Sequence, residues 1–367
     1  MSRSRSGERR GWSRALVLWV SLLGLCHPVS ASEDPASPPP LLDPTALQSP
    51  HDSASEYWDL SMRFDSGYAV FARFLLTNAG PGDGNAVVTG HVVTPEGEVR
   101  DFHNGRRRGR WLLSAEGRRL DVGSSQLDLQ GPEYQLEISK KEVKLDLRFA
   151  PTGRTRTPAV VTPANYRVDL LASAAPVRGS LWLKGMPEQI DVTGLAALVH
   201  TSTRDEEADV VLRRIEFFSL QKEATIYLLE LLTPMGKRTR WLHVSNGSSV
   251  VFCSTEVAVE ASGDACGGSR RGACSKQSKY WMPGSLRVTS PGLEAQLELR
   301  KVLLGRNPLQ ALPGAIRWLI SLTTSPHRVW AETAFDVTLW SGPDQSLLPG
   351  QGSGITAVTF LNPLAQP

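Results

Sequence analysis

Apolar and polar residues alternate with a period of two along several stretches of this chain. In residues 142–149 the apolar side chains Val143, Leu145, Leu147 and Phe149 share one face, while Lys144, Asp146 and Arg148 share the other. Residues 292–300 repeat the scheme, with Leu293, Ala295, Leu297 and Leu299 on one side. Successive side chains of a strand point to opposite faces of its sheet, so this pattern predicts strands with one buried face.

Turn signals separate these stretches. Short glycine-containing turns stand between apolar segments at 65–67, 95–97, 116–117, 235–236 and 246–247. Glycine accepts the positive φ that tight hairpins need. Residues 224–232 are almost continuously apolar, which predicts a strand buried on both faces, and apolar spacing predicts one helix over 308–322. The fold class is therefore all-β, with antiparallel barrels or sandwiches in two units.

The N-terminus has the three parts of a secretory signal peptide. Arginines at 3, 5, 9, 10 and 14 precede the apolar run 15–26, and small residues follow at 29–31. We expect cleavage after Ala31, because the run is too short to span ~30 Å of hydrocarbon as a membrane anchor. Arg9-Arg10 keeps a twin-arginine signal open, and the residues ending at Cys26 keep a lipoprotein signal open. Residues 32–55, rich in Pro, Ser and Ala, are predicted to form a disordered linker.

The net charge of the chain argues against nucleic acid as a binding partner. Removal of residues 1–31 takes away five arginines and one glutamate, which lowers the formal charge from +3 to −1 and gives no electrostatic case for nucleic acid. The exception is the run Arg106–Arg108 with Arg110, which fits either a solvated hairpin end or contact with an anionic head group or membrane surface.

Cys266 and Cys274 flank a short loop, so we expect a disulfide in an oxidising compartment, with Cys253 as a buried thiol. No zinc or cofactor motif appears, so no metal or cofactor is expected.

Several motifs, in order, carry a family resemblance. They are the Trp-containing opening strand 56–60, and the segments 179–185, 194–200, 214–221 and 328–339. This order resembles the lipocalin-like carotenoid 1,2-hydratases (hydroxyneurosporene synthases), a family that includes AttH-type proteins linked to ABC exporters. The resemblance covers residues 55–342. It implies two consecutive lipocalin-like antiparallel β-barrels, at 56–175 and 176–342, followed by a C-terminal tail at 343–367.

The family also implies a hydrophobic ligand in or between the barrels. Flat aromatic side chains would supply apolar walls for such a ligand. The candidates for ligand contact are Trp58, Trp182, Phe218, Trp281 and Trp330, with Glu332 beside the last of them.

Catalysis would need an acid that protonates an alkene carbon, held in an apolar pocket that raises its pKa. The family often shows Asp-His followed by Trp-Gly, whereas this chain has Val199-His200 and lacks the Trp-Gly. His200 is therefore one candidate. Glu216 is the other, because residues 216–221 resemble the family's acidic-aromatic strand. Arg214 and Glu216 share one strand face, opposite Ile215 and Phe217. His91 and His103 are expected to be surface or hydrogen-bonded histidines.

Three functional hypotheses follow. The first is an exported, secreted or periplasmic protein that binds a lipid or isoprenoid without catalysis. The second is an enzyme, a hydratase (lyase) or cyclase acting on an apolar polyene through Glu216 or His200. The third is an accessory protein of an ABC export system. Fold alone does not choose among them, because function resides in the site.

Overall fold

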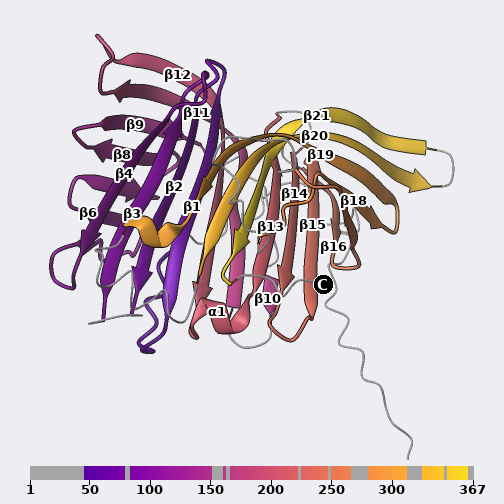
Figure 1. The fold of residues 1–367 in the computed structure, drawn as a ribbon, viewed down its shortest axis with the longest axis horizontal. Coiled ribbons are helices and arrows are strands. Elements are labelled where there is room, and N and C mark those ends of the chain that lie inside the picture. Colours follow the sequence, from indigo (N-terminus) through magenta and orange to yellow (C-terminus); the bar gives the residue numbers. More distant parts are fainter. Residues whose placement is uncertain are drawn as a thin grey trace, which may run out of the picture.

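The computed structural model describes residues 45–78, 83–150, 160–162, 166–221, 225–246, 249–265, 280–311, 325–342 and 345–362. In these ranges nearly every element is an antiparallel strand, which confirms the all-β class. Figure 1 shows two curled sheets side by side, the first coloured indigo to magenta and the second pink to yellow. Among the described residues, no helix has the length and apolarity needed to cross a membrane.

The first sheet contains twelve strands in the order β4-β3-β2-β1-β12-β11-β9-β8-β7-β6-β5, with β10 paired to β11. Its elements are β1 Ser55–Phe64, β2 Ala69–Thr77, β3 Asn85–Val93, β4 Val99–Arg106, β5 Leu112–Leu113, β6 Arg119–Val122, β7 Ser125–Asp128, β8 Tyr134–Ser139, β9 Val143–Phe149, β10 Val160–Thr162, β11 Tyr166–Leu183 and β12 Ile190–Thr203. The sheet curls until β4 meets β6, where the Asn104 side-chain amide donates to the Val122 carbonyl at 2.6 Å.

The second sheet contains nine strands in the order β16-β15-β14-β13-β21-β20-β19-β18-β17. The short helix α1 Glu207–Val210 joins the two sheets. The remaining elements are β13 Arg213–Ser219, β14 Thr225–Leu232, β15 Arg238–Asn246, β16 Ser249–Ser254, β17 Ala258–Ser262, β18 Ser285–Ser290, β19 Leu293–Arg306, the 3₁₀ turn η1 Pro308–Ala311, β20 His327–Gly342 and β21 Gln345–Phe360.

Strand periodicity is confirmed in detail. β9 alternates buried and exposed residues without a break, and β14 is buried on both faces as predicted. Four of the predicted turn glycines, at 67, 97, 117 and 236, have positive φ. The helix expected over 308–322 is described only as η1 at its first four residues; its remainder lies outside the described residues.

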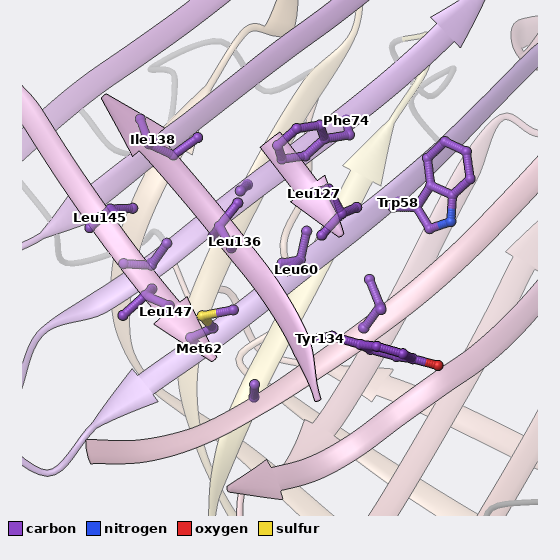
Figure 2. Close-up of a cluster of buried hydrophobic side chains, with 14 of the residues drawn as sticks. Trp58, Leu60, Met62, Phe74, Leu127, Tyr134, Leu136, Ile138, Leu145 and Leu147 are labelled. Carbon is purple, nitrogen blue, oxygen red and sulfur yellow. The ribbon is translucent and has the colours of Figure 1, made fainter. Parts of the chain in front are cut away.

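The inward faces of both sheets are filled by apolar side chains. In the first sheet, alternate residues of β1 and β2 pack against those of β7, β8 and β9, among them Trp58, Leu60, Met62 and Phe74 (Figure 2). A separate cluster occupies the inside of the second sheet. Further clusters lie between the sheets, where the outward faces of β2, β11 and β12 meet β13, β14, β20 and β21. The strand faces that would line a central barrel cavity are thus largely packed.

Two segments differ from the sequence predictions. Residues 345–360, expected in a C-terminal tail, form β21, which pairs along its length with β20 and through residues 354–360 with β13. The small and β-branched residues of 354–360 suit a strand buried on both faces, and all seven are buried. Residues 45–54, expected in a disordered linker, run along the first sheet and are called the strap below. Ala46 N–H donates to the Gly117 carbonyl at 2.9 Å, and the Ala46 side chain joins the apolar cluster.

Candidate functional site

A cavity of about 320 Å³ lies between the two sheets. We call it the inter-sheet cavity. Its walls come from the outward face of β2, β3 and β4 on one side, and from β20, η1 and the end of β21 on the other. Figure 1 shows η1 beside the first sheet, although it follows β19 of the second. The volume falls at the lower end of the range typical for small-molecule sites.

Trp330 forms the aromatic wall of this cavity. Its ring centroid lies 5.0 Å from that of Phe71 and 5.9 Å from that of His91. The Trp330 side chain is only 5% exposed, yet its indole N–H has no hydrogen-bond partner among the described residues. A buried donor without a partner is uncommon and costs free energy. Trp330 therefore gives the cavity an apolar wall, and its buried N–H has no partner within the part of the chain that the structure describes.

Cationic side chains line the same cavity. Arg73 and Arg328 come from opposite sheets and both contact Asp59. The Asp59 carboxylate accepts hydrogen bonds from Arg73 Nε at 2.7 Å and from Arg328 Nη1 at 2.9 Å. Burial of Asp59 opposes its ionisation, but the Arg328 and Arg73 guanidinium groups outweigh burial and hold the pKa of Asp59 well below its usual range. The Arg328 guanidinium also lies 4.7 Å from the centre of the Trp330 ring.

A smaller charged group stands at the cavity edge. His91 Nδ1 lies 2.8 Å from a carboxylate oxygen of Asp101, and Arg306 approaches the same oxygen at 3.6 Å. The hydrogen bond with His91 is the main reason that the pKa of Asp101 is lowered. His91 is thus hydrogen-bonded, as the sequence analysis expected, and it also lines the cavity.

Glu216 is buried between the sheets but lines neither this cavity nor the one described next. Its Oε1 accepts from Arg214 Nη2 at 2.6 Å and from the Tyr227 hydroxyl at 3.0 Å. Arg214 also donates to Tyr57, Tyr166 and Thr201 of the first sheet. The Glu216 carboxylate is therefore part of a charge-compensated network that joins the sheets.

His200 faces the inside of the first sheet, where it stacks on Trp58 with centroids 4.8 Å apart and planes 3° apart. Its Nε2 lies 2.7 Å from Oε1 of Glu56, and both side chains are buried. Glu56 in turn lines a second cavity of about 920 Å³ at the open end of the first sheet, which we call the mouth cavity. His200 thus lies inside the first sheet and Glu216, on β13 of the second sheet, lies between the sheets, so they do not form one site.

The other predicted site residues are dispersed. Phe218 packs between the sheets against Tyr227. The Trp182 ring lies beneath the Lys144 ammonium group, and its indole N–H donates to the Met186 carbonyl. Trp281 is 37% exposed. Glu332 forms an ion pair with Arg63 across the sheets at 3.1 Å. Of the predicted ligand contacts, Trp330 lines the inter-sheet cavity. Cys266 and Cys274 lie outside the described residues. In the described ranges no group of three His, Cys, Asp or Glu side chains is placed to hold a metal.

Sequence reasoning missed Phe71, Arg73 and Arg328, which line the cavity, and Asp59, which holds the two arginines. The available signal was local: Asp59 stands between Trp58 and Leu60 in β1, and a carboxylate in a buried strand needs a partner. Nothing in the sequence spacing points to Arg328, which lies 269 residues further along.

The two curled antiparallel sheets form a lipocalin-like fold with a cavity between them. Solved structures share this fold. They are a protein assigned as AttH from Nitrosomonas europaea (13% identity, TM-score 0.58, 88% of this chain and 99% of that one), CghA with Sch210972 (11%, 0.60, 89% and 96%), and kievitone hydratase from Nectria haematococca (13%, 0.54, 84% and 90%). At these identities the likeness establishes the fold. No protein-family model and no curated protein matches the sequence.

Proposed function

We propose that this protein binds a hydrophobic small molecule, of the lipid or isoprenoid class, in the inter-sheet cavity. The observation that carries the proposal is Trp330, a buried indole that lines the cavity and whose N–H has no partner among the described residues. An apolar ligand with one acceptor atom would cover the ring and satisfy that donor. The CghA structure, which has this fold, was solved with a small molecule, Sch210972, and this supports the proposal.

The cavity geometry favours binding over acid catalysis by Glu216. A catalytic acid must lie within hydrogen-bond reach of its substrate and hold a transferable proton. Glu216 lines neither cavity, and its carboxylate is engaged by Arg214 and Tyr227. The shared fold with kievitone hydratase is therefore no argument that Glu216 acts as the acid of a hydratase in this chain.

Native mass spectrometry of the protein purified from its own host tests the proposal first. We expect a bound apolar mass, and we expect the empty protein to take up farnesol as a neutral probe. Trp330→Phe keeps the wall but removes the N–H, so farnesol should be retained several-fold more weakly. Trp182→Phe is the matched control, since Trp182 lines neither cavity.

Each outcome has a defined meaning. A protein that stays empty when offered farnesol contradicts the proposal and favours the ABC-exporter accessory hypothesis. Recovery of farnesol with an added mass of water would favour the hydratase. Equal farnesol retention by the wild-type protein and Trp330→Phe would remove Trp330 from the site.

We further propose that the protein is exported after cleavage at Ala31, because residues 1–31 have the pattern of a signal peptide. Sequencing the N-terminus of the mature protein tests the cleavage. A peptide map without reductant tests the expected Cys266–Cys274 disulfide. An intact Met1 in the mature protein would contradict export by this signal.

A further inference from the structure

The mouth cavity is separate from the inter-sheet cavity. It lies at the open end of the first sheet, between the strap, the ends of β2, β11 and β12, and the hairpin that follows β4. The two cavities share no lining residue. With a volume of about 920 Å³, the mouth cavity is large enough for a molecule of lipid size.

One side of the mouth cavity is apolar and rigidly held. Leu76 and Trp111 both pack against the apolar cluster of the first sheet. The Trp111 indole N–H donates to the Gly84 carbonyl at 2.8 Å, which fixes the ring. Gly84 has a φ of +67°, and a Cβ there would lie 3.3 Å from the Arg108 side chain. The same glycine therefore positions both Trp111 and the stem of Arg108.

The strap forms the opposite wall and is fastened by Glu56. The carboxylate accepts the backbone N–H groups of Leu47 at 2.8 Å and Gln48 at 3.0 Å, in addition to its contact with His200. Gln48 has a φ of 44°, a conformation that non-glycine residues rarely adopt. Asn78 holds the next turn by donating to the carbonyls of Ser49 and His51. The wall is thus preformed.

The charges around this cavity favour an anion. Three arginines line it, namely Arg108, Arg167 and Arg204. Arg167 is paired with Asp169 at 2.7 Å, whereas Arg108 and Arg204 are exposed and form no ion pair with a described residue. Of the two lining carboxylates, Glu56 is engaged by the strap and His200, so the exposed charges of the lining are the two guanidinium groups of Arg108 and Arg204 and the one carboxylate of Asp83.

We propose that the mouth cavity is a second ligand site, which takes a single-chain amphiphile with an anionic head group. The guanidinium groups of Arg108 and Arg204 bind the head group through charge-assisted hydrogen bonds. The chain lies against Trp111 and Leu76. The proposal also gives a role to Arg108 of the arginine-rich hairpin, which does not line the inter-sheet cavity.

Isothermal titration of the mature protein with oleate, below its micelle concentration, tests this site. The double variant Arg108→Gln/Arg204→Gln should bind oleate about tenfold more weakly or worse. The control Arg107→Gln/Arg110→Gln removes the same charge from the neighbouring hairpin positions, which do not line the cavity, and should bind oleate as the wild type does. Oleyl alcohol, which lacks the charge, should bind weakly and equally to both variants.

Three results would overturn the proposal. They are wild-type affinity for oleate in the Arg108/Arg204 variant, an equal loss in the control, and full displacement of oleate by inorganic phosphate. The second would indicate a general basic surface, and the third a free-anion site. Because Trp330→Phe should leave the oleate titration of this site unchanged, failure here is distinguishable from failure of the inter-sheet proposal.

Discussion

Arg328 on β20 donates to Asp59 on β1 across the two sheets, with 2.9 Å between Nη1 and Oδ1. Both side chains are buried, at 6% and 4% exposure. The Asp59 carboxylate also accepts two hydrogen bonds from Arg73 of its own sheet, whose side chain is partly exposed, while Arg328 lies 4.0 Å from a second carboxylate, that of Glu216. This contact links the two sheets beside the inter-sheet cavity, which Arg73 and Arg328 both line.

Replacing Asp59 by Asn should strongly destabilise the protein. The change removes the nearest countercharge of the buried Arg328, which keeps only Glu216 at 4.0 Å, and of the partly exposed Arg73, and breaking a buried ion pair in this way typically costs about 3–5 kcal/mol. Glu332→Gln is the control, because Glu332 also pairs across the sheets but is about one-third exposed, and it should cost less than about 1 kcal/mol. Urea unfolding measures both. Equal losses in the two variants would contradict the role of Asp59.

The same carboxylate should contribute to acid sensitivity. Because the pKa of Asp59 is lowered in the folded state, its stabilisation is present above the unfolded pKa of about 4 and is lost as pH falls further. The free energy of unfolding of the wild type should therefore drop below pH 4 more steeply than that of Asp59→Asn. Parallel pH profiles would show that Asp59 stays paired in the unfolded chain or does not ionise.

His243 on β15 should destabilise the protein in mild acid. It is fully buried, neither ring nitrogen has a hydrogen-bond partner among the described residues, and burial lowers its pKa to about 4. The unfolded chain therefore takes up a proton near pH 6.5 that the folded chain resists, so stability should fall by up to about 3 kcal/mol between pH 6.5 and 4. His243→Leu should remove this dependence in thermal unfolding profiles, whereas His51→Gln, at an exposed position, should keep it.

Glu216→Gln should lower stability without weakening farnesol retention. Loss of the carboxylate leaves the buried Arg214 charge supported only by hydroxyl groups, at a cost of about 3 kcal/mol. Glu298→Gln, which alters an exposed ion pair, is the control. Chemical unfolding gives the stability, and native mass spectrometry of the folded fraction gives the retention. If Glu216→Gln kept the stability of the wild type but no longer retained farnesol, Glu216 would be a ligand-binding residue.

Glu56→Gln should loosen the strap. The neutral amide accepts weaker hydrogen bonds than the carboxylate, so hydrogen exchange at the Leu47 and Gln48 amides should accelerate about tenfold. The Ala46 amide, which donates to Gly117, is the internal control and should keep its rate. NMR exchange measurements distinguish them. If the Leu47 and Gln48 amides keep their rates, Glu56 does not hold the strap.

Much of the local structure could be predicted from residue pattern. The alternation in residues 143–149 predicted both a strand and its buried face, and the apolar run ending at Leu232 predicted a strand covered on both sides. The period of two also predicted that Glu216 and Ile215 point to opposite faces of their strand. In the structure Ile215 packs inside the second sheet, and Glu216 lies on the other face. These features depend on neighbours in sequence, which a linear pattern records.

Only the tertiary structure decided what each face meets. A period of two states that His200 and Leu198 share a side, but it does not say that this side lies inside the first sheet beside Trp58. Likewise, Glu216 could have faced a ligand, solvent or an arginine, and the second sheet placed Arg214 and Tyr227 around it. The sequence by itself determined an all-β chain with its strands and turns. The pairing of β1 with β12, the contact of Asp59 with Arg328 and both cavities required the folded chain, because they join residues more than a hundred positions apart whose interaction leaves no periodic trace.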